Sequence, residues 1–219
     1  MIQVLQVTKH YGTFRALDTM NFEVSEGEYV GLLGSNGSGK STLYRCILGI
    51  IPFEGEIRVE GKDSLREGKK VRGLIGYMPQ QASLHNDLTV SQTLQFYTAL
   101  RGGLLKDAYS MLERVELSDI QKLRVGELSG GMKQRLSFII ALIGDPKILL
   151  LDEPTVSMDG RSQQIFLTWL RELKEERKTV LLSTHLDQDV LSIMDRTLAL
   201  DHGQLVNFTN HAPTILKAA

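Results

Sequence analysis

Residues 34–42 have the types and spacing of a phosphate-binding loop. They read GSNGSGKST and fit the pattern G-x-x-x-x-G-K-[ST]. Glycines at this spacing let the backbone turn where a Cβ would clash, so consecutive N–H groups converge on a phosphate. The lysine brings a mobile positive charge to the β- and γ-phosphates, and the next hydroxyl is a ligand for Mg²⁺. The residues of this expected nucleoside triphosphate site are Gly34, Ser35, Asn36, Gly37, Ser38, Gly39, Lys40, Ser41 and Thr42.

The segments on either side of this loop are those that a phosphate loop requires. Residues 29–33 form a short apolar run typical of a buried strand, and residues 43–48 have the spacing of an amphipathic helix. The phosphate would lie at the positive N-terminal end of that helix. The alternative, a chance glycine-rich turn, does not account for this order of strand, loop and helix.

Two carboxylates form the second chemical element. Residues 148–151 are entirely apolar, as in a buried strand, and Asp152 and Glu153 follow directly. At the carboxyl end of a parallel strand, Asp152 would face the phosphate loop and hold Mg²⁺ through water. Glu153 would orient and polarise the attacking water, a general-base role worth roughly 10²–10⁴ in rate. The alternative is a pair of solvated acids at a strand end.

A second helix start that is poor in side chains is expected at residues 128–132, which read LSGGM. Ser129, Gly130 and Gly131 open a helix whose apolar positions follow a helical period. An exposed, positive helix start of this kind also attracts phosphate. The apolar positions are Leu136, Ile139, Ile140 and Ile143.

The rest of the chain alternates as an α/β protein does, with two additions. Early alternating segments between glycine, proline and charged turns predict an antiparallel outer sheet. Helical spacing over residues 89–117 predicts a helical insertion, and after residue 130 helices and strands alternate, which favours a mainly parallel core sheet. A hairpin around residues 201–203 and a short terminal helix complete the prediction. Outer strands are expected at residues 3–7, 21–24 and 56–59, and core strands at residues 29–33, 74–79, 148–151 and 179–182.

Composition narrows the class of protein. The chain has 219 residues, 42% of them hydrophobic, enough for a sizeable core. Its 25 basic and 26 acidic residues give a net charge of −1, so we expect no nucleic-acid surface. The single cysteine, Cys46, is expected to be a buried, inert thiol. Apolar stretches fall short of the roughly 20 residues that cross a bilayer, so we expect a soluble chain able to dock on a membrane protein.

Together these motifs resemble those of the ABC-family ATPases, the ATP-binding subunits of ABC transporters, over nearly the whole chain. The segment 128–132 is similar to the family signature LSGGQ. The resemblance implies an α/β fold: a P-loop NTPase core with a mainly parallel sheet, an antiparallel β subdomain and a helical lobe. It implies one nucleotide-binding domain, residues 1–219, with the lobe inserted at about residues 84–145.

The same resemblance implies cofactors and partners. Two ATP molecules with Mg²⁺ would lie between one subunit's phosphate loop and the signature helix of a second ATP-binding subunit, in a head-to-tail homodimer. A separate transmembrane permease subunit would place its coupling helix on the surface near residues 80–88. The protein would lie peripherally on the cytoplasmic face of the membrane.

Three further residues match the family pattern one by one. Tyr11 is similar to the aromatic residue that stacks on adenine. Gln80 resembles the glutamine that senses Mg²⁺ and the attacking water, although Gln81 leaves two registers open. His185 follows the strand 179–182 as the family's switch histidine does, where it would contact the γ-phosphate. Taken alone, the tyrosine could equally belong to the core or rim, and the histidine could be structural.

Two positions depart from the family pattern. The last signature position is Met132 rather than glutamine, and we expect little loss because backbone groups and Ser129 would contact phosphate. After the carboxylates the family often has S-A-L-D, whereas this chain has V-S-M-D at residues 156–159. Asp159 is retained, but Val156 replaces the hydroxyl that would cross the dimer.

The sequence therefore predicts an ATPase that drives a conformational cycle in a transmembrane subunit. One alternative is a non-transport ABC ATPase that acts as a switch on a ribosome or DNA partner. Another is a binding module that associates with ATP without turnover, which Glu153 and His185 disfavour. A P-loop kinase is disfavoured by the segment 128–132 and by the lack of a recognisable acceptor site.

Overall fold

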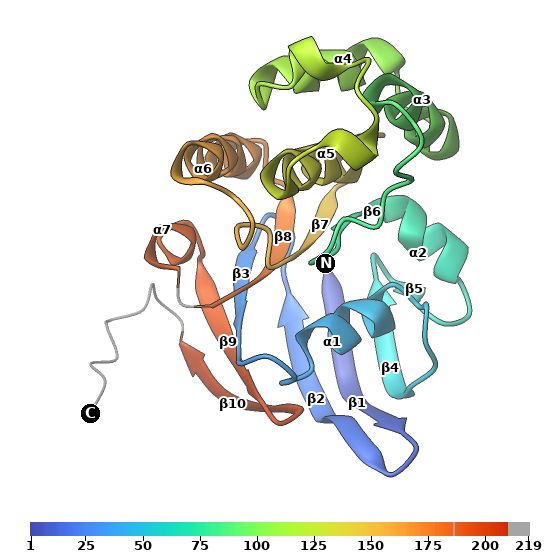
Figure 1. Ribbon diagram of the computed structural model, residues 1–219. Coiled ribbons are helices and arrows are strands. Elements are labelled where there is room, and N and C mark those ends of the chain that lie inside the picture. Colours follow the sequence, from blue (N-terminus) through green and yellow to red (C-terminus); the bar gives the residue numbers. More distant parts are fainter. Residues whose placement is uncertain (186, 210–219) are drawn as a thin grey trace.

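Two β-sheets and the helices around them make up the fold (Figure 1). The structure is a computed structural model that describes residues 1–185 and 187–209. The larger sheet has six strands in the order β10-β9-β3-β8-β7-β6. All neighbours in it are parallel except β10 and β9, which confirms the mainly parallel core sheet. Its strands are β3 (Tyr29–Leu33), β6 (Ile75–Met78), β7 (Ile148–Asp152), β8 (Thr179–Thr184), β9 (Arg196–Asp201) and β10 (Gln204–Thr209).

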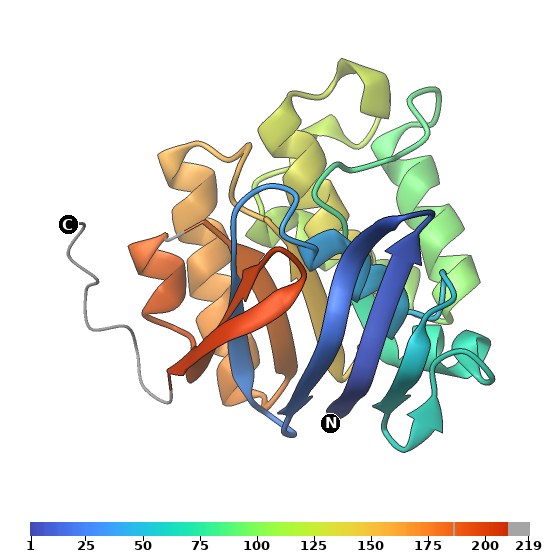
Figure 2. The same ribbon diagram turned by 90° about the horizontal axis from the view of Figure 1, so that it is seen from below.

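The smaller sheet is antiparallel, as the alternating early segments predict. Its order is β2-β1-β4-β5, and its first two strands lie side by side in Figure 2. Both are longer than the sequence suggests, because Tyr11 ends β1 and Phe14 begins β2 around a tight turn. The hairpin therefore extends to the neighbourhood of the phosphate loop. The strands are β1 (Ile2–Tyr11), β2 (Phe14–Val24), β4 (Glu54–Val59) and β5 (Lys62–Asp63).

The six-stranded sheet separates two apolar cores. Strand β7 supplies both, since Leu149 and Leu151 face one core and Ile148 and Leu150 face the other. A strand buried on both faces reads as a continuous apolar run, which is why the sequence shows no alternation here. The first core packs against α5 (Gly130–Leu142) and α6 (Gly160–Glu175), and the second against α1 (Lys40–Ile47) and the antiparallel sheet.

The helical segment predicted over residues 89–117 is two helices, α3 (Val90–Arg101) and α4 (Leu105–Arg114). The break falls at Gly102, whose φ of 79° ends α3 in the left-handed region that favours glycine. Thr89 begins α3 with a capping box to Gln92. Helices α3, α4 and α5 lie together at one end of the molecule (Figure 1). Along the chain, two 3₁₀ turns, η1 (Ser118–Ile120) and η2 (Val125–Glu127), connect α4 to α5.

Two short helices were not predicted from the sequence, α2 (Gly68–Leu74) and α7 (Gln188–Leu191). Each is too short to show an apolar period, so only its packing reveals it. The hairpin around residues 201–203 is confirmed as the β9–β10 turn. The predicted terminal helix falls beyond residue 209, outside the described residues.

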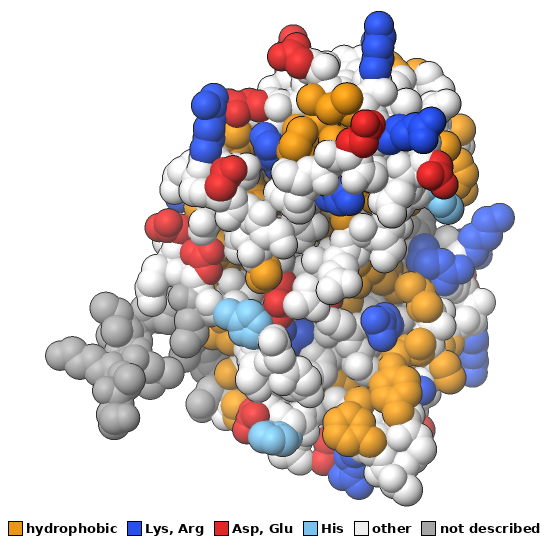
Figure 3. Space-filling view, viewed as in Figure 1, with side chains coloured by type: hydrophobic (Ala, Val, Ile, Leu, Met, Phe, Trp, Pro, Cys, Tyr) orange, Lys and Arg blue, Asp and Glu red, His pale blue; other side chains and the backbone are white. Residues whose placement is uncertain are grey.

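Other expectations from composition have a structural counterpart. Cys46 is buried, as expected, and burial raises the pKa of its thiol to about 12, which disfavours the reactive thiolate. On the face in Figure 3, basic and acidic side chains are interspersed. Across residues 1–185 and 187–209, no helix combines the length and apolar character needed to span a bilayer.

Candidate functional site

The phosphate loop connects β3 to α1, as the sequence predicts. Gly39 precedes the helix with a φ of 113°, and a Cβ there would lie 2.7 Å from the Ala16 carbonyl oxygen. At Gly34 a Cβ would lie 2.4 Å from the Leu200 carbonyl oxygen. Both positions therefore need glycine for a physical reason, because backbone from β2 and β9 lies against the loop.

The Lys40 side chain is turned into the loop and is only 5% exposed. Its Nζ donates to the carbonyl oxygens of Gly34 at 2.7 Å and Ser35 at 3.1 Å. The same Nζ lies 3.1 Å from Glu153 Oε1. The tertiary structure thus brings the lysine of the first motif to a carboxylate 113 positions later in the chain.

Asp152 lies at the end of β7 with a hydroxyl on each side. Ser41 Oγ donates to its Oδ2 at 2.6 Å, and Ser183 Oγ donates to its Oδ1 at 2.6 Å. The register of the parallel strands pairs Asp152 with Ser183. Sequence reasoning gave Ser183 no role, although its hydroxyl at the end of an apolar strand was the available signal.

Polar side chains from three other segments meet at the Glu153 carboxylate. Besides Lys40, Gln80 Nε2 donates to Oε2 at 2.7 Å, and His185 Nε2 lies 2.8 Å from Oε1. The Glu153 N–H donates to Ser183. The backbone of Glu153 has a φ of 48°, an uncommon value for a residue other than glycine, and such values cluster at functional sites.

Gln80, the first of the two candidate glutamines, donates a hydrogen bond through its amide to the Glu153 carboxylate. The backbone oxygen of Gln80 accepts a 3.1 Å hydrogen bond from Gln134 Nε2 on α5. Sequence reasoning missed Gln134, for which no local motif gives a signal.

A pocket of about 410 Å³ joins the phosphate loop to the tip of the first hairpin. Tyr11 lines it, with Lys9 Nζ 4.9 Å from its ring centroid. Phe14, which sequence reasoning missed, lines the same pocket and is 62% exposed. Its signal was an aromatic residue three positions after Tyr11, across a glycine. The full lining is Tyr11, Phe14, Ala16, Asn36, Gly37, Gly39, Lys40, Ser41, Thr42, Gln80 and Glu153.

The signature residues do not line this pocket. Ser129 caps α5, and its Oγ accepts from the Met132 N–H at 3.2 Å. The start of the helix rests on the loop after Glu153, since a Cβ at Gly131 would lie 3.1 Å from the Ser157 carbonyl oxygen. Val156 in that loop is 62% exposed. The second helix start is thus formed as predicted, on a surface apart from the phosphate pocket.

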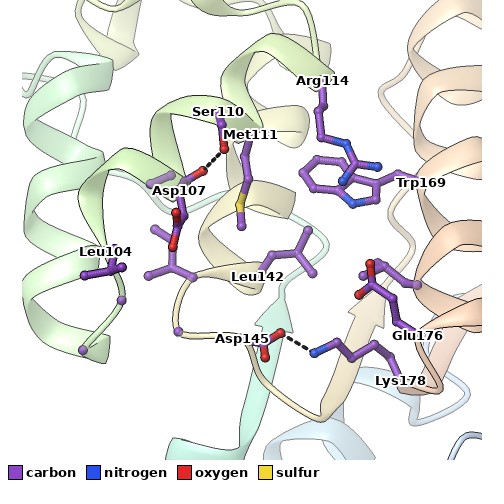
Figure 4. Close-up of a pocket in the computed structure, with 16 residues that line it drawn as sticks. Leu104, Asp107, Ser110, Met111, Arg114, Leu142, Asp145, Trp169, Glu176 and Lys178 are labelled. Carbon is purple, nitrogen blue, oxygen red and sulfur yellow. Dashed lines mark hydrogen bonds and ion pairs between the residues drawn. The ribbon is translucent and has the colours of Figure 1, made fainter.

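A second pocket, of about 390 Å³, lies between α4, the turn after α5, and α6 (Figure 4). Arg114 stacks on Trp169 at 4.3 Å, and Lys178 pairs with Asp145. None of the predicted site residues lines it. Of these two pockets, it is the first that predicted site residues line.

Comparisons with known proteins give the class. The family model described as ABC transporter matches residues 17–156. The chain is 36% identical over 212 residues to the uncharacterized ABC transporter ATP-binding protein MJ1023 of Methanocaldococcus jannaschii, covering 94% of this chain and 76% of the relative. It is 37% identical over 208 residues to the Nod factor export ATP-binding protein I of Rhizobium sp. (strain N33), covering 93% and 68%.

Solved structures agree with this class. The dimeric structure of the ABC transporter cassette MJ0796 has a TM-score of 0.89 at 30% identity, over 96% of this chain and 98% of that one. A dimeric post-hydrolysis state of the same cassette, bound to ADP and Pi, also scores 0.89, at 28% identity over 96% and 98%. The chain belongs to the ABC transporter family. Within that family it is an ATP-binding subunit, and its reaction is the hydrolysis of ATP.

Proposed function

We propose that Glu153 is the catalytic base of this ATPase and that His185 and Gln80 are its catalytic partners. The observation that carries the proposal is the convergence of Lys40, Gln80 and His185 on one buried carboxylate beside the phosphate loop. In the reaction, a water oxygen forms a bond to the γ-phosphorus while the bond to the β–γ bridging oxygen breaks. Glu153 orients that water and accepts its proton, and His185 contacts the γ-phosphate.

The phosphate loop binds the triphosphate in this proposal. Backbone N–H groups of residues 34–42 surround the β-phosphate at the N-terminus of α1, and Lys40 contacts the β- and γ-phosphates. Lys40 exchanges its present contacts with Gly34, Ser35 and Glu153 for phosphate oxygens. The lysine side chain therefore lines the pocket that would receive the triphosphate.

The residues around Asp152 fit Mg²⁺. The adjacent oxygens of Ser41 and Asp152, 2.6 Å apart, are the hard ligands this ion prefers. Ser41, Asp152 and the Gln80 amide oxygen would hold it, Asp152 through water. When bound, Mg²⁺ supplies positive charge at the β- and γ-phosphates. Ser183 keeps the Asp152 carboxylate oriented through its 2.6 Å hydrogen bond.

The base of the nucleotide lies against Tyr11 in this proposal. Tyr11 is 44% exposed, and its ring borders the same pocket as the phosphate loop. Stacking of a base on an aromatic ring is worth roughly 1–3 kcal/mol and tolerates different bases. Phe14 provides a second aromatic surface at the pocket rim.

A second copy of the chain completes the site. Ser129, Gly130 and Gly131 form a positive helix start that does not border its own chain's phosphate pocket. In a head-to-tail homodimer this surface meets the γ-phosphate bound to the other copy, a contribution in trans similar in logic to an arginine finger. The dimeric cassettes among the structural neighbours support this arrangement.

The membrane partner docks near residues 80–88 in this proposal. A groove of about 270 Å³ lies there between the segment after β6, α3 and α5. Leu84, Tyr97 and Leu100 give it apolar walls, and Leu100 is 69% exposed. An amphipathic coupling helix from a transmembrane subunit suits such a groove. The chain would then act on the cytoplasmic face of the membrane, as one nucleotide-binding domain with a helical lobe at about 84–145.

The test of catalysis is Glu153→Gln. We expect ATP binding to persist, turnover to fall by roughly 10²–10⁴, and a dimer to accumulate with ATP. Size-exclusion chromatography with and without ATP, together with phosphate release, measures both effects. Glu175→Gln, on the exposed face of α6, is the matched control. Unchanged turnover in Glu153→Gln would remove the catalytic assignment.

The test of the partner is co-purification from gently solubilised native membranes. We expect a polytopic membrane protein in nearly equal amount, lost on Leu100→Glu and kept on Leu65→Glu, whose side chain is 43% exposed away from the groove. Ribosomes or DNA-repair proteins in its place would favour the alternative, a non-transport ATP-driven switch.

A further inference from the structure

One buried polar side chain connects the signature helix to the glutamine at Glu153. Gln134 lies on α5, five positions after Ser129, and is 3% exposed. Its Nε2 donates to the Gln80 carbonyl oxygen at 3.1 Å. Its Oε1 is buried and has no hydrogen-bond partner among the residues that the structure describes.

The Gln134 amide, whose Nε2 has a hydrogen-bond partner and whose Oε1 has none, does not owe its place to the stability of the fold. Around Gln134, the neighbouring residues of α5, Leu136, Phe138 and Ile139, belong to an apolar core. A buried acceptor without a partner destabilises a fold by at least as much as a single hydrogen bond, such as the one to Gln80, stabilises it, so the two effects offset each other. What the glutamine supplies is therefore its one hydrogen bond, to the backbone of Gln80.

The surroundings make that hydrogen bond a rigid link. Helix α5 lies directly against β6, because a Cβ at Gly76 would come within 2.1 Å of the Ala141 carbonyl oxygen. Gln80 follows two residues after β6 ends, and its side chain donates to Glu153 at 2.7 Å. A continuous path of two hydrogen bonds thus runs from α5, through Gln80, to the Glu153 carboxylate.

We propose that Gln134 is a positioning residue that holds Gln80 in reach of Glu153 and ties its placement to the signature helix. The proposal rests on the proposed function of Glu153. A displacement of α5, whose start faces the other copy's nucleotide, is transmitted through Gln134 to the Gln80 backbone. Gln134 itself touches neither phosphate nor water; it acts only through Gln80.

The experiment compares ATP hydrolysis by the full chain with Gln134→Met, which removes the donor and the unpartnered acceptor at nearly constant volume. We expect kcat to fall about tenfold, with KM for ATP within about twofold and the melting temperature not lowered, as a lost hydrogen bond worth one factor of ten predicts. Gln164→Met, on an exposed position of α6, is the control. Gln134→Leu, which also removes the amide donor without burying a charge, is expected to reproduce the loss of kcat and is the second variant should the first misfold.

A double-mutant cycle with Gln80→Ala separates positioning from general damage to the fold. If Gln134 acts through Gln80, Gln134→Met has no further effect on kcat once the Gln80 side chain is absent. An equal loss of kcat in both backgrounds overturns the proposal, as does an unchanged kcat in the single variant. A wild-type chain without ATPase activity, or an active Glu153→Gln, would instead contradict the proposed function.

Discussion

The two helix starts that the glycine-rich motifs form differ in how complete they are. Helix α1 begins after Gly39 without a side-chain cap, so its N–H groups remain available, and Lys40 and Ser41 stand in its first turn. Helix α5 begins at Ser129, whose hydroxyl already accepts from Met132, and its first turn carries no acidic residue. The α1 start forms a complete phosphate site within one chain, whereas the α5 start offers only the positive end of a helix dipole and small side chains.

This difference is the reason to propose that two copies share one nucleotide site. The α1 site has its own cation, the paired oxygens of Ser41 and Asp152 and the nearby Glu153, and it lines a pocket. The α5 start borders no part of that pocket, and in the proposed dimer its positive end meets a phosphate bound to the other copy. Variants at the two starts should therefore fail in different ways.

Of the two helix starts, the α1 start is expected to give the larger effect. Lys40→Ala removes the buried cation of the α1 site, and turnover should fall by roughly 10²–10³, as for other single donors that contact developing charge. ATP affinity should fall as well, because the lysine contacts phosphate in the ground state. Isothermal titration measures the ATP affinity, and phosphate release measures the turnover. Lys106→Ala, on an exposed position of α4, should match the wild type.

Gly130→Asp should damage the α5 start and leave the α1 site intact. A Cβ at Gly130 has ordinary room, 3.7 Å from Ser157 Cβ, so the fold should tolerate the change. The new negative charge would face the other copy's γ-phosphate, and such contacts cost several kcal/mol, so turnover should fall by roughly 10².

The state of assembly sharpens that test. In the Glu153→Gln background, Gly130→Asp should abolish the ATP-dependent dimer while ADP still binds to the isolated chain. Gly160→Asp places the same charge at the start of α6, where the Cβ position is open, and should change neither property. A stable ATP dimer in the Gly130→Asp variant would argue against a shared site.

A smaller effect is expected at the aromatic rim of the α1 pocket. Tyr11→Ala and Phe14→Ala should each weaken ADP binding by about 1–3 kcal/mol, because each removes a stacking surface from the pocket. Fluorescence titration with an adenine-modified ADP measures the change. Phe96→Ala, an equally exposed aromatic on α3, serves as the comparison. Full affinity in both rim variants would place the base elsewhere.

The smallest effect is expected at the last signature position. Met132→Gln restores the residue usual in the family and should change kcat by less than about twofold. The Met132 backbone N–H already donates to Ser129, and in the proposed dimer the phosphate is contacted by backbone groups and Ser129 rather than by the side chain of residue 132. A large gain in kcat would mean that the side chain at this position takes part in the trans contact.

Much of the fold was predictable because its signals are local. The core strands β3, β7 and β8 are unbroken apolar runs, and the loop at residues 34–42 carries its own glycines and lysine. The break between α3 and α4 was not predicted. It depends on the left-handed backbone of a single glycine, Gly102, and the spacing of apolar residues does not reveal such a local change. Short helices such as α7 have too few turns to show a period.

What the sequence by itself determined is the type of chemistry: a phosphate loop, two carboxylates at a strand end and a second helix start are readable at fixed spacings. The tertiary structure decided which side chains meet. It brings the Gln80 amide to Glu153, adds Ser183 beside Asp152 and Gln134 behind Gln80, and carries Phe14 to the pocket rim. These contacts join residues far apart in the chain, and they depend on sheet order and helix packing, which no local pattern encodes.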